Sequence, residues 1–163
     1  MSFRFGMKIR RLQPDEWPVL RDLRLRAATE SPYELGETVA ELRARTTDEY
    51  WVQQADDDSR AIFVVWKNEV PSALIYAKAQ ISDVLAEATF AALWLDPILR
   101  GRGIGRQLLC SAIDWVKTRG ATHGSLLVVE GNQQAIEFFQ REGFTKTSPF
   151  SIRRFWRMER QLS

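Results

Sequence analysis

The chain has 163 residues, the usual size of one domain and small for two. Hydrophobic residues make up 45% and charged residues 27%, which excludes intrinsic disorder, collagen-like sequence and a disulfide-stapled miniprotein. The 23 basic and 21 acidic residues give a formal charge of +2, too balanced for general attraction to nucleic acid or an anionic membrane. We expect one domain over residues 1–163, with residues 1–6 as a candidate extra or flexible N-terminus.

The sequence also predicts the cellular compartment of the protein. Cys110 is the single cysteine and cannot form an intrachain disulfide, which suits a reducing compartment. The start of the chain lacks the apolar stretch of a secretory signal, and no run of about 18 apolar residues is present to span a bilayer. We therefore expect a cytoplasmic protein with no membrane partner.

The first third of the chain predicts one strand followed by helices. The strand is expected at Met7–Leu12, and Pro14 then opens a helix whose apolar residues recur three and four positions apart. Residues 30–36 form a break around Ser31 and Pro32. Two short helices with weaker patterning are expected beyond it, at Thr38–Arg45 and Asp48–Gln54.

The rest of the chain mixes strands and helices. Three strands are expected at Ala61–Trp66, Ala73–Ala79 and Ala88–Leu95, with a hairpin turn at residues 67–69. Helical spacing of apolar residues predicts a helix over Gly103–Thr118, which Gly120 caps. The last expected elements are a strand at Ser125–Val129, a helix at Gln133–Glu142 and strands near Phe144–Thr147 and Arg154–Leu162. The fold class is therefore α/β or α+β with a mixed sheet.

A glycine-rich turn joins the third of these strands to the following helix, in the sequence Leu93-Trp-Leu-Asp-Pro-Ile-Leu-Arg-Gly-Arg-Gly-Ile-Gly-Arg106. Backbone N–H groups at a helix start have no intrahelical acceptor and form an anion site when no side chain obstructs them. The glycines are Gly101, Gly103 and Gly105, and the cations beside them are Arg100, Arg102 and Arg106. Guanidinium groups suit bidentate recognition of phosphate oxygens, so the turn predicts a pyrophosphate site.

Two common glycine motifs do not fit this turn. The dinucleotide fingerprint needs a glycine where Arg106 stands, and the Walker loop needs a Gly-Lys-Ser/Thr sequence that the chain lacks. What remains is Arg100, Gly103 and Gly105 in the pattern Arg-x-x-Gly-x-Gly, which resembles the coenzyme A motif of the GNAT superfamily of acyl-CoA-dependent N-acetyltransferases. The alternative interpretation is a tight strand-to-helix connection without a ligand.

A second segment strengthens the resemblance. Asn132 follows a strand and precedes a helix that ends in Gly143-Phe144, which resembles the downstream block of the same superfamily. The resemblance is clear over residues 88–144 and looser in the opening strand and helix and in the final strand. It implies a single N-acetyltransferase domain with a GNAT-like fold, in which helices flank a mixed, mostly antiparallel sheet of about six to seven strands. The sheet is splayed at its fourth strand, which here is Ala88–Leu95.

The resemblance also implies a cofactor site for acetyl-CoA or coenzyme A. The splayed strand would pair with the pantetheine arm through Leu93, Trp94 and Leu95, and Asn132 would bond that arm. Asn132 also suits the alternative role of helix N-cap. The pyrophosphate would lie on the turn, at Arg100, Gly101, Arg102, Gly103, Ile104, Gly105 and Arg106.

One position departs from the family pattern. Phe139 stands where members often carry a tyrosine that can protonate the leaving thiolate, and phenylalanine has no hydroxyl. We interpret Phe139 as an apolar wall beside the thioester. The thiolate then takes its proton from water, from the acceptor amine or from another group, or activity is weak.

An alkylammonium with a pKa near 10.4 must lose a proton before it attacks, so a base is needed. Strict alternation puts Glu87, Thr89, Ala91 and Leu93 on one face of their strand, which makes Glu87 the candidate base. A solvated loop position is the alternative interpretation of Glu87. Asp83 is a similar but more distant candidate, and Glu130 is expected to be solvated.

No metal site is expected, because one histidine and one cysteine do not make a ligand cluster. His123 precedes its strand at the end opposite the cofactor and is expected on the surface. Cys110 lies in the helix behind the turn and is expected to be a packing residue.

The region between the first helix and the second strand should select the acceptor. Tyr33, Glu37 and Tyr76 are the candidate substrate-binding residues, and aromatic walls with a carboxylate would suit a small cationic amine. Tyr50 and Trp51 are further candidates, for which helix packing is the preferred interpretation.

The sequence therefore predicts an enzyme that moves an acetyl group from acetyl-CoA to a primary amine of a small molecule or peptide, by direct attack in a ternary complex. The alternative is a degenerate acyl-CoA-binding or sensing module. Nucleic-acid binding, suggested by arginines near the C-terminus, is disfavoured by the balanced charge. A homodimer is a further candidate assembly.

Overall fold

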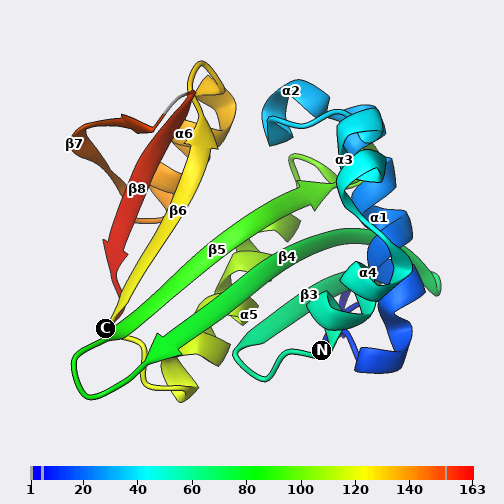
Figure 1. Ribbon diagram of the computed structural model, residues 1–163, viewed down its shortest axis with the longest axis horizontal. Coiled ribbons are helices and arrows are strands. Elements are labelled where there is room, and N and C mark those ends of the chain that lie inside the picture. Colours follow the sequence, from blue (N-terminus) through cyan, green and yellow to red (C-terminus); the bar gives the residue numbers. More distant parts are fainter. Residues whose placement is uncertain (1, 5, 153) are drawn as a thin grey trace.

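The computed structural model describes residues 2–4, 6–152 and 154–163, with side chains over 6–147 and 154–163. Its elements form one sheet with helices on both faces (Figure 1). The strands are β1 (Ser2–Arg4), β2 (Met7–Arg11), β3 (Arg60–Lys67), β4 (Val70–Ile81), β5 (Ala86–Leu95), β6 (His123–Val129), β7 (Thr145–Ile152) and β8 (Phe155–Gln161). The helices are α1 (Trp17–Glu30), α2 (Pro32–Leu35), α3 (Val39–Arg45), α4 (Asp48–Ala55), α5 (Ile104–Thr118) and α6 (Gln133–Arg141), with 3-10 turns η1 (Pro14–Glu16) and η2 (Pro97–Leu99).

The sheet order is β1-β2-β3-β4-β5-β6-β8-β7, in which β5 and β6 are parallel and the other neighbours antiparallel. A parallel neighbour needs a long crossover, and the turn with α5 provides it. The expected mixed, mostly antiparallel sheet is confirmed. The sheet has eight strands rather than six or seven because the short β1 pairs with β2.

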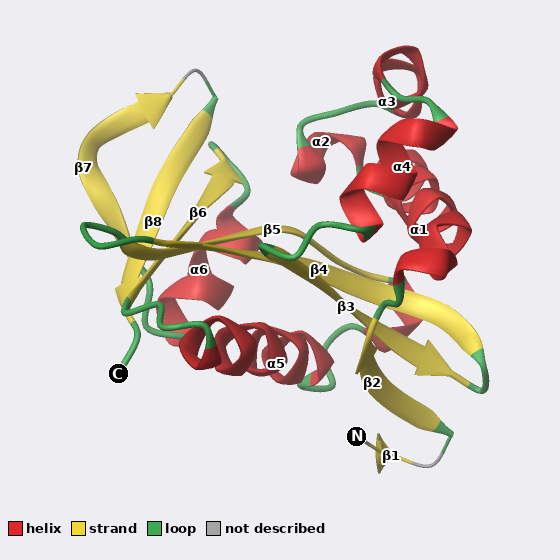
Figure 2. Cartoon of the chain, turned by 60° about the horizontal axis from the view of Figure 1, so that its bottom comes forward, coloured by secondary structure: helices red, strands yellow, loops and turns green. Residues whose placement is uncertain are grey.

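The helices divide between the two faces of the sheet (Figure 2). α5 and α6 cover one face, over a core that includes Leu108, Ala112 and Ile136. α1 to α4 cover the β2–β4 part of the other face, over a second core that includes Leu20, Leu23 and Trp51. Trp51 is therefore a packing residue, as the preferred interpretation had it.

Several boundaries differ from the sequence expectation. Residues 32–35 of the expected break form the short helix α2, which Gly36 ends at φ 72°. The β3–β4 hairpin forms as expected, with Asn68 and Glu69 at positive φ, but β4 begins at Val70 rather than Ala73. Strand β7 continues to Ile152, well past the expected end at Thr147.

Strand β5 contains a β-bulge. Tyr76 of β4 lies opposite Ala91 and Leu74 lies opposite Trp94, so two residues of β5 oppose the one residue between them on β4. Ala92 in the bulge has φ 54°, an uncommon value for a residue with a side chain. The extra residue changes which residues of β5 face α5.

The bulge also marks the point where the sheet opens. Pairing between β5 and β6 ends at Phe90 and Leu126, and the two strands then diverge, as Figure 1 shows. This confirms the splay at the fourth expected strand. Before the bulge Ala88 and Phe90 pack against the α5 core, and after it Leu93 and Leu95 do so.

Candidate active site

A cleft of about 1250 Å³ follows the opening between β5 and β6. At one end it reaches the glycine turn and the first turn of α5, and at the other it passes between the α1–α4 helices and the open face of β6 and β8. A cofactor and an acceptor approaching from opposite ends would meet beside the bulge.

The backbone of β5 beyond the bulge is directed at this opening. Residues of an antiparallel pair alternate between bonding the partner strand and pointing away from it. Asp96 N donates to Ser72 O at 2.9 Å, so Trp94, two residues earlier, also bonds β4. The backbone groups of Leu93 and Leu95 consequently point into the gap, as a strand-like ligand requires, whereas those of Trp94 do not.

The glycine turn leaves room for a close backbone approach. Gly101 and Gly103 have φ of 74° and 78°, and a Cβ built on either would meet no described atom within 4 Å. Gly103 is the N-cap of α5, so the free N–H groups of the 15-residue helix start directly beyond it. Gly105 packs against the Phe138 ring, to which a Cβ would lie 3.6 Å away. The turn thus fits a pyrophosphate group.

The three arginines of the turn do not share one role. Arg100 is bonded inward: its Nε and Nη2 donate to Leu95 O at 3.1 and 2.9 Å, and Nη2 also reaches Glu30 and Ser31. The exposed Arg106 forms an ion pair with the largely buried Glu142 at 3.4 Å, and Arg102 is exposed. The expectation that Arg100 presents its guanidinium to the pyrophosphate does not match this geometry, in which that side chain anchors the strand end.

Two further predicted cofactor residues lie at the same end of the cleft. Asn132 lines the cleft, and its Oδ1 accepts from Ala135 N at 3.2 Å, which makes it the N-cap of α6. Phe139 also lines the cleft but is only 8% exposed, with its ring edge-on to Phe138 and Phe144. Its place in the core agrees with the interpretation of an apolar wall.

Glu87 lies away from the opening, which corrects its proposed reach towards the splay. It pairs with Gln80 and His123 in the closed part of the sheet and is not among the described residues that line the cleft. Strict alternation would place Leu93 on the same face of β5 as Glu87. The bulge after Ala91 instead places Leu93 on the opposite face of the strand. Asp83 and Glu130 are likewise outside the described lining.

The predicted substrate-binding residues divide as well. Tyr33 is 58% exposed and its hydroxyl donates to Glu130 O at 3.3 Å, which closes α2 over the end of β6 without lining the described cleft. Glu37 and Tyr76 do line it. Burial raises the pKa of the Tyr76 hydroxyl in spite of the nearby Arg24, so this hydroxyl stays protonated at neutral pH.

Four cleft arginines were not predicted as site residues: Arg24 of α1, Arg45 of α3, Arg141 of α6 and Arg157 of β8. Arg24 Nη1 donates to Tyr76 Oη at 3.0 Å, and Arg45 binds Glu37 through two guanidinium nitrogens. The hydrogen bonds to Glu37 raise the pKa of Arg45. A single arginine on a helix or strand resembles a solvated surface residue, so the sequence carries no clear signal for this cluster.

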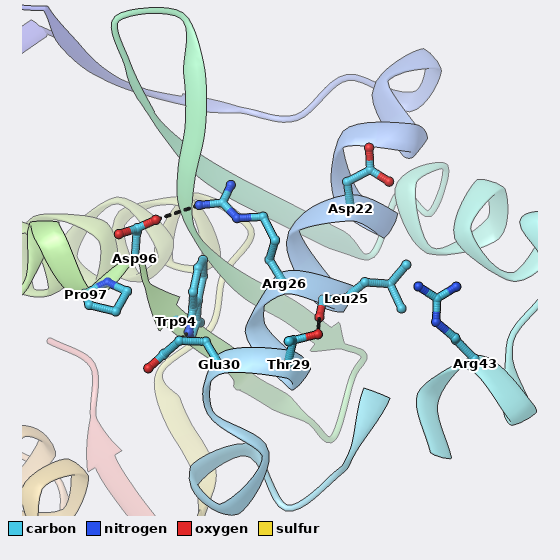
Figure 3. A pocket seen from close by; sticks show the side chains of 9 residues that line it. All are labelled: Asp22, Leu25, Arg26, Thr29, Glu30, Arg43, Trp94, Asp96 and Pro97. Carbon is cyan, nitrogen blue, oxygen red and sulfur yellow. Dashed lines mark hydrogen bonds and ion pairs between the residues drawn. The ribbon is translucent and has the colours of Figure 1, made fainter. Parts of the chain in front are cut away.

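A second, smaller hollow of about 440 Å³ lies between α1, Arg43 of α3 and the end of β5 (Figure 3). Arg26 reaches across it to Asp96, with 2.7 Å between Nη2 and Oδ2. Glu30 and Trp94, which also line this hollow, are joined by a 3.0 Å bond from the indole Nε1 to Oε1. The end of β5 is therefore tied to α1 at several points.

Two expectations outside the cleft need correction. Cys110 is exposed on α5 rather than packed. His123 is half-buried and its Nε2 lies 3.1 Å from Glu159 Oε1, so it belongs to a polar cluster rather than to open surface. Over the described part of the chain, His, Cys, Asp and Glu form no group suited to a metal ion, and no helix there is long and apolar enough to cross a bilayer.

Comparison with curated proteins finds N-acetyltransferases. The chain is 35% identical over 97 residues to an uncharacterized N-acetyltransferase of Methanocaldococcus jannaschii, a match that covers 58% of this chain and 42% of that protein. It is 28% identical over 129 residues to the mycothiol acetyltransferase of Beutenbergia cavernae, which covers 76% of this chain and 39% of that protein. The matched part is therefore less than half the length of either relative.

Solved structures share the whole fold. The PaiA N-acetyltransferase of Thermoplasma acidophilum, solved in complex with coenzyme A, aligns with a TM-score of 0.77 at 20% identity, covering 99% of each chain. The model of the Acetyltransferase (GNAT) family matches residues 17–144, from the start of α1 to the residue after Gly143. With this match over most of its length, the chain belongs to the GNAT family of acetyltransferases.

Proposed function

We propose that this protein transfers an acetyl group from acetyl-CoA to a primary amine of a small molecule or peptide by direct attack in a ternary complex. The observation that carries the proposal is the joining of two features in one cleft: the open glycine turn at the start of α5 and the backbone of β5 facing a gap. The first suits a pyrophosphate and the second an amide-containing arm.

Each part of the cleft has its own task in this proposal. The N–H groups after Gly103 hold phosphate oxygens, and the cations of Arg102 and Arg106 add electrostatic attraction at the rim. The backbone of Leu93 and the N–H of Leu95 bond the pantetheine arm, while the Leu95 carbonyl is already occupied by Arg100. Asn132 and Phe139 complete the wall of the slot. The bound thioester supplies an activated acetyl group.

Proton transfer in this cleft does not depend on Glu87. The carboxylate of Glu37 is held by Arg45 and lies 3.7 Å from Arg24, so its charge is already neutralised. We infer that the ammonium proton leaves to solvent through the open cleft. Because Phe139 carries no hydroxyl, the departing thiolate takes its proton from water or from the acceptor amine.

Thermal shift with acetyl-CoA, coenzyme A and ATP tests the cofactor site first. A ligand that binds the native state raises the unfolding temperature by mass action, so the two coenzyme A compounds should stabilise the protein and ATP should not. Thiol release against a panel of amines then tests turnover. A protein that coenzyme A fails to stabilise would overturn the proposal.

A degenerate acyl-CoA-binding or sensing module is the second candidate function. Phe139 and the neutralised Glu37 favour it, because Phe139 carries no family-type acid and Glu37 is already paired with arginine. Tight binding of acetyl-CoA without thiol release across the amine panel would support this module and contradict the enzyme.

We also propose a cytoplasmic setting, because the exposed thiol of Cys110 suits a reducing compartment. A homodimer remains the proposed assembly, which sedimentation of the protein at several concentrations would test.

A further inference from the structure

The acceptor end of the cleft carries arginine on both of its walls. The acceptor end is the part of the cleft beyond the bulge, between the α1–α4 helices and the open face of β6 and β8. Its described lining holds three arginines, Arg24, Arg45 and Arg157, against two carboxylates, Glu34 and Glu37, with Tyr76 and Leu127 between them. The charge of this end decides which amines can approach it.

Glu37 is saturated by its own neighbours. Arg45 donates to both carboxylate oxygens, from Nε to Oε1 and from Nη2 to Oε2, and Arg24 Nη2 lies 3.7 Å from Oε2. The Glu37 side chain is only 20% exposed, so little of it can meet a ligand. Two guanidinium groups and one carboxylate leave the cluster with a net positive charge.

Arg24 is bonded to the β4 residue that pairs with Ala91, next to the bulge. Its side chain is 14% exposed and lies over the rings of Trp51 and Tyr76, with its carbon Cζ 5.7 and 5.3 Å from the ring centroids. The bond to Tyr76 Oη holds it above β4 at the residue paired with Ala91, directly beside the bulge. A fixed and largely desolvated guanidinium attracts a carboxylate more strongly than an exposed one.

The opposite wall combines a cation with apolar surface. Arg157 lies across from Leu127 in the β6–β8 ladder, and its Nε is bonded to Glu159 at 3.2 Å. Glu159 also accepts from Thr147 and contacts His123, so its charge is shared among several partners. Leu127 is 53% exposed to the cleft side and offers contact for an apolar side chain.

We propose that the acceptor is a primary amine that carries a carboxylate near its nitrogen, as an amino acid does, rather than a small cationic amine. The proposal rests on the function proposed above and names its substrate class. Arg24 binds the carboxylate, which places the amine a few bonds away, at the bulge. A polyamine would meet like charges on both walls and is disfavoured.

The chemistry balances without any further reactant. The neutral amine nitrogen attacks the thioester carbonyl carbon, a C–N bond forms, and the C–S bond breaks as the thiolate leaves. The nitrogen loses one proton and the thiolate gains one, so nothing is oxidised or reduced. The carboxylate of the acceptor stays ionised against Arg24 throughout.

The test compares matched acceptors that share one side chain: the free amino acid, its carboxamide and its decarboxylated amine, using the leucine and phenylalanine series, with spermidine as the polyamine. An α-amine next to an amide group has a pKa near 8, so the carboxamide is chemically the easiest to deprotonate. A preference for the acid would thus run against intrinsic reactivity. We expect kcat/KM for at least one acid to exceed that of its carboxamide and amine by about tenfold or more.

The outcomes separate the two proposals. Equal or faster thiol release with carboxamides, decarboxylated amines or spermidine would overturn the acceptor class and leave acetyl transfer intact. Stabilisation by coenzyme A without thiol release from any amine would overturn acetyl transfer itself. Further stabilisation of the coenzyme A complex by the acid, and not by its carboxamide, gives an expected readout that does not require turnover.

Variants locate the carboxylate. In Arg24→Gln, KM for the preferred acid should rise about tenfold or more while kcat/KM for the carboxamide changes less than about threefold. Arg21→Gln is the matched control, since Arg21 lies one turn earlier on α1, is bonded to Asp22 and Asp48, and is absent from the described lining. If Arg24→Gln does not fold, Tyr76→Phe gives the comparison, because it removes the hydroxyl that holds Arg24 in place. Equal losses for acid and carboxamide in the folded variant would refute the assignment.

Discussion

Arg100 and Glu30 join the glycine turn to the last residue of α1. The Glu30 carboxylate accepts from Arg100 Nη2, from Ser31 Oγ and, at 3.0 Å, from Trp94 Nε1. Burial opposes the ionisation of Glu30, but these bonds outweigh it and lower its pKa. The carboxylate therefore fixes the position of both the strand end and the turn that follows it.

Loss of the Glu30 carboxylate should weaken cofactor binding without unfolding the protein. In Glu30→Gln the amide keeps the shape but loses the charge, and because the site is partly exposed we expect about a fivefold rise in Kd for coenzyme A. Calorimetric titration measures it. Asp22→Asn removes an exposed charge from the same helix and should leave Kd unchanged. Wild-type affinity in Glu30→Gln would show that the turn is positioned without this carboxylate.

Alanine at Gly103 should have two effects, backbone strain and obstruction of the ligand, whereas alanine at Gly120 should have only the first. Gly103 and Gly120 both have positive φ, 78° and 101°, and a Cβ meets nothing closer than 3.8 Å at either. Replacement by alanine should cost each variant about 1–2 kcal/mol of stability. Only Gly103→Ala should also weaken coenzyme A binding, by at least about tenfold, since its methyl group would stand over the helix start. Equal affinities of the two variants for coenzyme A would refute the anion site.

Acid should destabilise the fold within a defined range. The pKa values of four carboxyl groups are lowered by hydrogen bonds in the folded state: Glu16, Glu30, Asp57 and Glu159. A lowered folded pKa means that the unfolded chain binds more protons, so stability is complete above the glutamate reference value of 4.5 and falls as pH drops below it. Urea unfolding between pH 7 and pH 3 checks this.

Glu16 offers a variant for the acid experiment. It makes two bonds with Arg10, at 2.8 and 2.7 Å, and the hydrogen bond with Arg10 is the main reason that its pKa is lowered. Glu16→Gln should flatten the loss of stability below pH 4.5, whereas Glu49→Gln, on the exposed side of α4, should not. A protein that gains stability on acidification would contradict the direction.

Cys110 should react with a disulfide reagent in the native state because its thiol is exposed on α5. We expect one equivalent of thiol to be labelled without loss of coenzyme A binding, as followed by absorbance and thermal shift. The same reaction adds background to any thiol-release assay, so Cys110→Ser is the suitable parent for kinetics. Protection of Cys110 by bound coenzyme A would show that the cofactor reaches beyond the first turn of α5.

Much of the cofactor end follows from the sequence because it depends on local rules. Residues 96–105 alone predict three of its features: glycines at positive φ, the proline after Asp96 and the start of an amphipathic helix. The N-cap role of Asn132 is local in the same sense. Each of these features needs only neighbouring residues to form.

The acceptor end could not be predicted in this way because its contacts join distant residues. The bond from Arg24 to Tyr76 spans 52 positions, and the bond from Tyr33 to the Glu130 carbonyl spans 97. Nothing around Arg24 or Tyr33 in the sequence distinguishes the one that lines the cleft from the one that does not. The sequence also suggests that Glu37 is a free carboxylate, because its pairing with Arg24 and Arg45 appears only in the structure.

The bulge at Ala92 and Leu93 is a difference in residue number between β5 and β4, and it does not depend on side-chain chemistry. Strand β5 has one residue more than its neighbour over the same span, and that surplus turns every later side chain of the strand to the opposite face. Deleting Ala92 would place Leu93 opposite Ile75 and restore one-to-one pairing with β4, while Trp94 would stay opposite Leu74. The opening of the sheet thus coincides with a one-residue mismatch between two strands, which a substitution keeps and the deletion of one residue removes.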